Sequence, residues 1–347
     1  MNKRTFMLMV AALFVLKAAA QEIENKQRTL LIKTAATWCP PCGGWGWNLF
    51  EGMIEDNEDK ALLIAAHHSG DLMTEEAVDL FDNFGATYQP FFFLNEMNLQ
   101  ANSSNASAKR VEIAQTVSET FLNQMPVANV GFVPKYANSK LSVDAKVKFF
   151  QPASGEYYLS IFLMEDGIIN YQASIGNNAV HKKIIRFGFT DNTFGELITN
   201  GAIAAGQEFT LPFELLIGGV EGYDYEVAGI IWKKENNKFL PVNVWSTKTI
   251  ETVSAVSSIG AIQSFIITPN ITGSQAVINL ELQNSLNNAS IDIIDIHGKA
   301  IANISQGTLS AGLQTFSIDK SDIGQNGLYF VRVTDGKNVS TRRIIFQ

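Results

Sequence analysis

The amino-acid sequence predicts a multidomain protein, in which an α/β domain is followed by two all-β sandwich domains of the immunoglobulin-like kind. The chain has 347 residues, which is more than one hydrophobic core usually needs. Before residue 126, apolar strand-like runs alternate with helical patterns, and after it apolar and polar residues alternate with period two. We therefore expect domains over residues 21–126, 127–250 and 265–347, with a linker over residues 251–264.

Residues 1–20 have the pattern of a secretory signal peptide. Lys3 and Arg4 precede an apolar run over residues 6–16, and alanines at 18–20 supply the small residues of a cleavage site. The alternative is a membrane anchor, but this run is shorter than the ~20 residues that span a bilayer. The sequence therefore predicts an exported protein with no transmembrane span in the mature chain.

The α/β domain is expected to alternate strands and helices. Apolar runs predict strands over residues 29–36, 61–68 and 90–95, and helical spacing predicts helices over residues 40–55, 75–84 and 107–124. Ser107 is the expected N-cap of the last helix, with Val111 and Phe121 on its buried face.

The rest of the chain has the pattern of antiparallel sandwiches. Strict alternation predicts strands over residues 140–150, 156–165 and 225–234 in the first of them. In the second, two strands flank a turn at Gly298, and the last two strands flank a two-residue Asp335-Gly336 turn.

Composition excludes several functions. The net charge of −8 leaves no basic patch large enough to neutralise several phosphates, so we expect no nucleic-acid partner. Cys39 and Cys42 are the only cysteines, which is too few for a structural zinc site, and His181 and His297 are isolated in the sequence. We therefore expect no metal and no organic cofactor.

The two cysteines form a C-x-x-C pair where a predicted strand ends and a helix begins. Backbone N–H groups and the helix dipole favour a thiolate there, so Cys39 would act as nucleophile and Cys42 as resolving thiol. Pro40 and Pro41 suit a first helical turn, where an N–H has no intrahelical partner. The alternative is a structural disulfide, but closing so short a loop stabilises a fold by only about 2 kcal/mol.

The segment "ATWCPPC" resembles the active site of the exported thioredoxin-fold thiol:disulfide oxidoreductases. The resemblance covers roughly residues 27–125 and implies a thioredoxin-like domain whose partners are protein or peptide thiols and disulfides. It implies that Pro90 is a cis-proline that guides the substrate. It also implies that Gln89 and Trp38 contact that substrate.

The chain departs from this family at Lys33, where many members have a buried acid that accepts the proton of the resolving thiol. Either Lys33 points outward or another group performs the acid–base step. Gly43, Gly44 and Gly46 follow Cys42, where they either allow a peptide backbone to approach or weaken the helix.

His67 and His68 end the second predicted strand and are candidates for a proton relay. Adjacent strand residues face opposite ways, so at most one of them can point at the sulfurs. The alternative is a pair of histidines with structural partners at a strand end.

The C-terminal segment resembles the type IX secretion C-terminal sorting domain. The resemblance rests on Pro269-Asn270, "IDIIDIHGKAI" and "NGLYFVRVTDGKNVSTRRIIFQ", and covers approximately residues 265–347. It implies that this segment binds the type IX secretion machinery, and that the protein passes the periplasm and reaches the cell surface or outer membrane, or is secreted. In an ordinary sandwich module, Arg342 and Arg343 would instead be edge-strand charges that prevent aggregation.

With this ending, the chain is similar to outer-membrane-related thioredoxin-like proteins of Gram-negative bacteria. The resulting hypothesis is an exported thiol:disulfide oxidoreductase with a W-C-P-P-C site. The alternative is a surface binding or structural protein, in which the cysteine pair stays oxidised and the middle sandwich binds a ligand.

Overall fold

The computed structural model describes residues 23–137, 139–252, 259–295 and 298–347. The predicted signal peptide and His297 lie outside the described residues. In the part of the chain that is described, no helix is long and apolar enough to cross a membrane.

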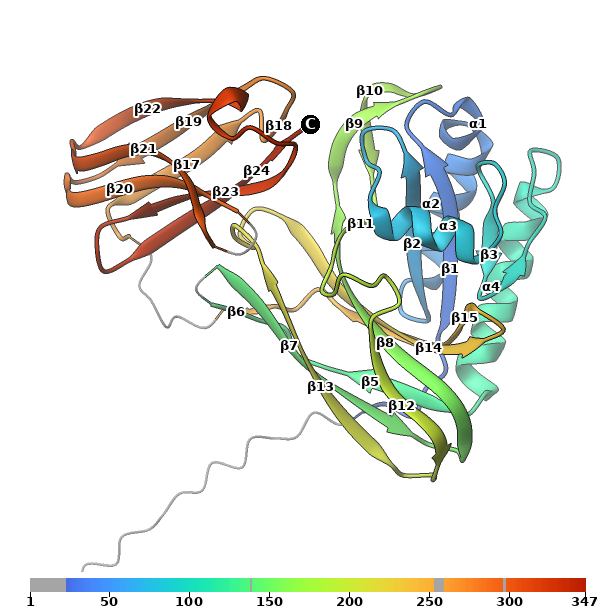
Figure 1. Cartoon of the computed structure of the whole chain (residues 1–347). Helices are drawn as coiled ribbons and strands as arrows, with labels where there is room; N and C mark the ends of the chain where they lie inside the picture. The colour runs from blue at the N-terminus through green and yellow to red at the C-terminus, as the bar shows by residue number, and fades with distance from the viewer. Residues whose placement is uncertain (1–22, 138, 253–258, 296–297) are drawn as a thin grey trace, which may run out of the picture.

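The N-terminal part is an α/β unit with helices on both faces of a sheet (Figure 1). Strands β1 (Thr29–Ala36) and β2 (Ala61–Ser69) are parallel, β3 (Phe92–Leu94) is antiparallel to β1, and β4 (Met97–Asn98) follows it. The helices are α1 (Pro40–Gly43), α2 (Trp45–Asn57), α3 (Glu75–Asn83) and α4 (Ala106–Asn123). Alternate residues of β1 face opposite ways, so Leu31 packs with α2 and α4 while Ile32 packs with α3.

Two helices differ from the prediction. The helix expected over residues 40–55 is interrupted at Gly44, which separates α1 from α2. The expectation that Ser107 caps the last helix is wrong, because α4 begins at Ala106 and Asn105 is its N-cap. Val111 is 57% exposed rather than buried, since the inward face of α4 carries Ile113 and Val117.

The sheet of the α/β unit continues into the segment beyond residue 126. Its order is β15-β14-β8-β11-β2-β1-β3-β4, and β12 also pairs with β8. The added strands are β8 (Ala153–Asp166), β11 (Ile184–Gly188), β12 (Glu196–Ile203), β14 (Asp224–Glu235) and β15 (Lys238–Thr247). The junction is the parallel pairing of Ile184 with Ala65, where the Ala65 N–H donates to the Lys183 carbonyl oxygen at 2.8 Å. The α/β unit and the middle segment therefore share one sheet across the expected boundary.

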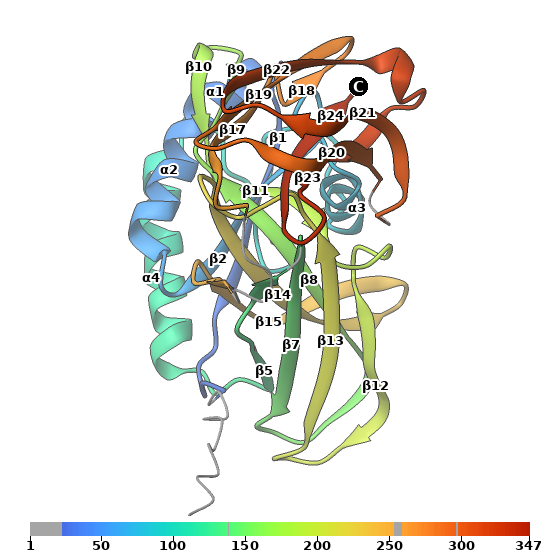
Figure 2. The ribbon, with the colours of Figure 1, turned by 90° about the vertical axis from the view of Figure 1, so that its left-hand side faces the viewer.

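A second sheet covers the outer part of this shared sheet (Figure 2). It contains β5 (Ala128–Gly131), β6 (Lys135–Ala137), β7 (Lys140–Phe149), β13 (Glu208–Leu216) and β16 (Glu251–Thr252). The apolar core between the two sheets includes Phe149, Leu163 and Val227. A separate hairpin of β9 (Ile168–Gln172) and β10 (Gly176–His181) projects from this segment toward α1.

The C-terminal unit is a sandwich of two sheets with its own core. One sheet has the order β17-β19-β22 and the other has the order β18-β24-β23-β20-β21. Their bounds are β17 (Ile262–Thr268), β18 (Ile271–Thr272), β19 (Gln275–Leu282), β20 (Leu286–Ile294), β21 (Ala300–Leu309), β22 (Gly312–Asp319), β23 (Gly327–Thr334) and β24 (Val339–Phe346), with a 3-10 turn at Lys320–Asp322. The expected two-residue turn is wrong, because Thr334 pairs with Val339 and residues 335–338 form the connection.

The C-terminal unit packs against the middle segment through buried side chains. Phe330 and Ile294 contribute to the core of the middle sandwich. Arg343 is 7% exposed and donates to Glu165 at 3.0 Å. Because Arg343 is buried against Glu165, the alternative in which it is a solvent-facing edge-strand charge is wrong.

Candidate functional site

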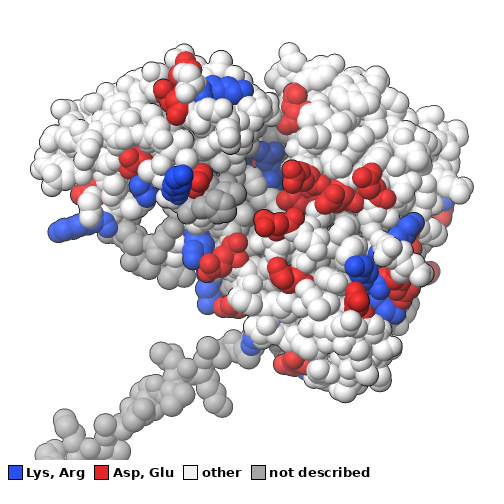
Figure 3. Space-filling view, in the orientation of Figure 1, with Lys and Arg blue, Asp and Glu red and all other residues white. Residues whose placement is uncertain are grey.

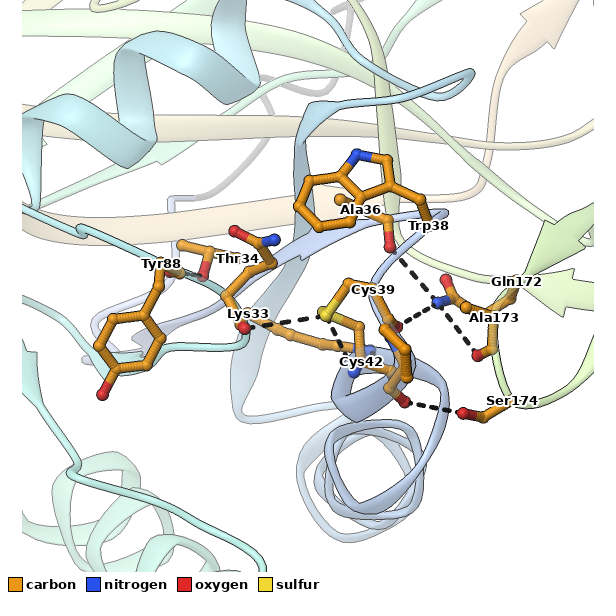
Figure 4. The surroundings of a disulfide bond; sticks show 12 residues. Lys33, Thr34, Ala36, Trp38, Cys39, Cys42, Tyr88, Gln172, Ala173 and Ser174 are labelled. Atoms are coloured by element: carbon orange, nitrogen blue, oxygen red, sulfur yellow. Dashed lines mark hydrogen bonds between the residues drawn. A yellow bond between two sulfur atoms is a disulfide. The ribbon is translucent and has the colours of Figure 1, made fainter.

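The two cysteines form a disulfide at the first turn of α1 (Figure 4). Cys39 is the N-cap, and Pro40 and Pro41 occupy the first helical positions without an N–H to donate. The Cys42 N–H donates to Cys39 Sγ at 3.1 Å. This amide favours negative charge on the Cys39 sulfur when the disulfide is open, because it donates directly to that atom.

Pro90 lies next to this turn and follows a cis peptide bond from Gln89. Thr34 of β1 fixes the position of the cis-proline segment, residues 89–91. The Phe91 N–H donates to Thr34 Oγ1 at 2.8 Å, and the Thr34 N–H donates to the Phe91 carbonyl oxygen at 2.9 Å. The Gln89 carbonyl oxygen is 3.7 Å from Cys39 Sγ. A Cβ at Gly46 would lie 2.9 Å from Pro90 Cγ, so the missing side chain lets Pro90 approach α2.

Trp38 directly precedes Cys39, and Gln89 directly precedes the cis-proline. Trp38 is 55% exposed, and its Nε1–H donates to Ser69 Oγ at 3.1 Å. Gln89 Oε1 is 2.9 Å from His68 Nε2, and the His68 ring stacks on Phe81 with centroids 4.0 Å apart. The structure thus joins His68 to the cis-proline segment.

His67 faces the opposite side of the sheet and is buried. Its ring is 5.3 Å from the ring of His181 on β10, which is in turn 5.2 Å from the ring of Trp47. Burial holds the pKa of His67 well below its usual value and lowers that of His181 to about 4, so both imidazoles are neutral near pH 7. Neither His67 nor His68 hydrogen bonds to a cysteine sulfur in the described structure.

Lys33 points inward, beneath the disulfide. Its side chain is buried, and Nζ donates to the Cys42 carbonyl oxygen at 3.2 Å. The same ammonium group lies 5.3 Å and 5.4 Å from the rings of Trp47 and Phe50. Burial lowers the pKa of Lys33 to about 7, against the opposing attraction of Glu51. The outward orientation of Lys33, which the sequence left open, is therefore wrong.

The β9–β10 hairpin packs against the turn that contains Cys39 and Cys42, which is called the cysteine turn below (Figure 4). Gln172 Nε2 donates to the Cys39 carbonyl oxygen at 3.0 Å and to that of Ala36 at 3.3 Å. The Ala173 N–H donates to the Thr37 carbonyl oxygen at 2.8 Å. Ser174 Oγ donates to the Pro40 carbonyl oxygen at 3.1 Å. Together these bonds fix the backbone on which Cys39 stands.

Gly43 explains how the hairpin comes so close. A Cβ at this position would overlap the carbonyl oxygen of Ala173. One of the two roles expected for the glycines after Cys42 was to let a peptide backbone approach. At Gly43 a backbone does approach, and it belongs to the β9–β10 hairpin of the same chain. With the hairpin in place, Cys39 is 2% exposed and Cys42 is fully buried.

Sequence reasoning missed the hairpin residues and Thr34. Gln172 lies 133 positions from Cys39, and no motif in the sequence connects the two. His181 was visible as one of four histidines, but only the fold brings it beside His67. In the described part of the chain, no group of three or more His, Cys, Asp or Glu residues could hold a metal ion.

Charge on the surface is mixed. On the face in Figure 3, basic side chains are scattered and acidic ones are at least as prominent. This face therefore offers no continuous basic surface to a polyanion.

Comparison with known families identifies the C-terminal unit. Residues 269–347 match the family model described as a secretion system C-terminal sorting domain. This segment is a type IX sorting domain, so the protein is exported to the cell surface or outer membrane, and the segment interacts with the secretion machinery. No curated protein sequence matches the chain.

Among solved structures, HBP35 of Porphyromonas gingivalis is similar over 94% of this chain and 100% of its own. The TM-score is 0.57 and the sequence identity is 16%. At this identity the likeness concerns the fold, and it extends over the α/β unit, the middle segment and the sorting domain together.

Proposed function

We propose that this protein is an exported thiol:disulfide oxidoreductase that acts on protein disulfides through Cys39 and Cys42. In this proposal residues 21–126 are a thioredoxin-like domain, and the sorting domain carries the enzyme to the outer membrane or cell surface. The observation that carries the proposal is the juxtaposition of a C-x-x-C disulfide at a strand–helix junction with a cis-proline segment, whose Gln89 carbonyl oxygen is 3.7 Å from Cys39 Sγ.

Each residue has a separate role in this reaction. The Cys39 thiolate attacks a substrate disulfide, because its sulfur accepts the Cys42 N–H, which favours the negative charge. Cys42 then attacks Cys39 and releases the substrate as a thiol. Pro90 and Gln89 line one side of the reacting sulfur and would orient the substrate backbone. Trp38, which directly precedes Cys39, would present an exposed ring to the substrate.

The two serine variants of the pair test the proposal. We expect reduced Cys42→Ser protein, mixed with insulin as a disulfide substrate, to accumulate a mixed disulfide at Cys39, which non-reducing electrophoresis and mass spectrometry detect. Cys39→Ser is the matched control, since it keeps one thiol in the same turn, and it should form no adduct. A folded Cys42→Ser protein that forms no adduct would overturn the proposal.

One observation favours the second candidate function, a non-enzymatic surface binding protein with an inert disulfide. The β9–β10 hairpin packs against the turn that contains the two cysteines, and Cys39 is only 2% exposed, so little of its surface is open to a substrate. In that alternative, the middle sandwich binds the ligand, and replacing both cysteines with serine leaves ligand binding unchanged.

A further inference from the structure

Three basic side chains share the buried space beneath the disulfide. Lys33 comes from β1, His67 from β2 and His181 from β10, and each is at most 3% exposed. Lys33 Nζ lies 5.3 Å from the Trp47 ring, the Trp47 ring lies 5.2 Å from that of His181, and the His181 ring lies 5.3 Å from that of His67. Burial lowers the pKa of both imidazoles, and the charge of Lys33 adds to this effect. Charging all three at once in an apolar enclosure is unfavourable, so the group holds few protons near pH 7.

Lys33 is the member of this group that contacts the cysteine turn. Its Nζ donates to the backbone of Cys42 at 3.2 Å, and the rings of Trp47 and Phe50 close the space around it. Figure 4 shows its side chain extending from β1 to the turn. Cys42 is fully buried, so water does not reach its sulfur in this conformation.

The redox reaction removes a proton from the Cys42 sulfur in one direction and returns it in the other. A buried Cys42 must lose its proton before it can attack Cys39, and it must regain one after it has been expelled from the disulfide. We propose that Lys33 accepts and returns this proton. The inference rests on the proposed function, since without a redox cycle Cys42 exchanges no proton.

The step balances in both directions. In the resolving direction, the Lys33 amine takes the proton of the Cys42 thiol, the thiolate forms a bond to Cys39 Sγ, and the bond between Cys39 and the substrate sulfur breaks with its electron pair on the substrate. In the reverse direction, an incoming thiolate bonds to Cys39 Sγ, the Cys39–Cys42 bond breaks, and the Cys42 thiolate takes a proton from the Lys33 ammonium.

The other titratable groups around Lys33 are less suited to this task. His67 and His181 have pKa values depressed by burial, to about 4 for His181, so they are weak bases. Glu51 on α2 attracts the Lys33 ammonium, but its carboxylate is already paired with Lys182 at 2.5 Å. A base whose pKa of about 7 lies near the working pH transfers protons most effectively in both directions.

A two-step thiol assay separates the two sulfurs. Reduced protein is mixed with dithiobis(nitrobenzoate) in a stopped-flow instrument. The attack by Cys39 releases a first coloured thiolate, and the resolving attack by Cys42 releases a second. For the wild type we expect the rate of the second release to rise with pH around 7, the pKa of Lys33.

Two variants at residue 33 show whether Lys33 acts by accepting a proton or only through its positive charge. Lys33→Met removes the amine at similar volume, and Lys33→Arg retains a charge that does not lose its proton. We expect the second release to slow by ~100-fold in both, with the first release within about twofold of wild type. Lys60→Met, at a lysine that bonds to Ser118 away from the cysteines, is the control and should match the wild type.

The possible outcomes separate the two proposals. An unchanged second release in Lys33→Met, or a full rescue by Lys33→Arg, overturns the role of Lys33 and leaves the proposed function intact. If wild-type protein shows no first release, the proposed function fails and the role of Lys33 with it. Circular dichroism of each variant establishes that it is folded. If only one of the two variants folds, its rate of second release still shows whether the Lys33 amine is needed for the attack by Cys42.

Discussion

At the scale of residues, the surroundings of the cysteines are set by what lies on each face of two strands. Lys33 and His67 point to the α2 side of the sheet, while Thr34 and His68 point to the side of the cis-proline segment and α3. The sequence predicted that successive strand residues face opposite sides of the sheet, and it raised the question whether Lys33 points outward. The partner of His67 was not, because His181 comes from a hairpin that is remote in sequence.

The buried histidine predicts a pH dependence of stability. Burial lowers the pKa of His181 from 6.5 to about 4, so the unfolded chain binds a proton in this window and the folded chain does not. The free energy of unfolding therefore falls as the pH drops from 6.5 to 4, by about 3 kcal/mol from this group. Relative to His181→Phe, the wild type should lose stability over this window in urea denaturation. A difference between the two proteins that is constant with pH would contradict this explanation.

At the scale of elements, the site depends on a hairpin that reaches it from the middle segment. The sequence predicted β1 at its observed bounds and the strand–helix junction at Cys39. It did not predict the break at Gly44 or the β9–β10 cover, because both depend on contacts between distant segments rather than on local periodicity. The glycines after Cys42 carried a signal of close approach, but they did not reveal what approaches.

Gly43→Ala tests the fit of the hairpin. The added Cβ would overlap the Ala173 carbonyl oxygen, so the hairpin must shift, at a cost of about 1–3 kcal/mol in the free energy of unfolding. We also expect the reduced variant to be alkylated faster at Cys39 than the wild type, as measured by mass spectrometry. Gly260→Ala is the control, since its Cβ would meet no atom within 4 Å. Unchanged stability and alkylation in Gly43→Ala would show that the hairpin does not restrain the turn.

At the scale of the whole molecule, the three units are less separate than the sequence suggested. One sheet runs from β4 to β15, and the sorting domain inserts Phe330 and Ile294 into the core of the middle sandwich. Period-two alternation predicts strands but not their neighbours, so it could not place β11 beside β2. Buried Arg343, Glu165 and Arg186 form a further link between the sorting domain and the shared sheet.

Removing this link should loosen the sorting domain. In Arg343→Met, Glu165 loses a buried cationic partner, and we expect a loss of about 3 kcal/mol in the free energy of unfolding. Limited proteolysis should then release the C-terminal unit sooner than in the wild type. Lys140→Met, which breaks an exposed ion pair with Glu214, is the matched control and should cost at most about 1 kcal/mol. Equal effects of the two substitutions would contradict a docked sorting domain.

The central claim is that the Cys39–Cys42 disulfide is a working redox site, and its reduction potential tests that claim most directly. Purified mature protein is equilibrated in glutathione buffers, and the fraction of disulfide is read by thiol trapping and mass spectrometry. We expect a potential between about −120 and −270 mV, in the range of oxidoreductases that exchange electrons with protein thiols. A potential below about −300 mV would mean a disulfide that resists the glutathione pool, and would contradict the proposed function.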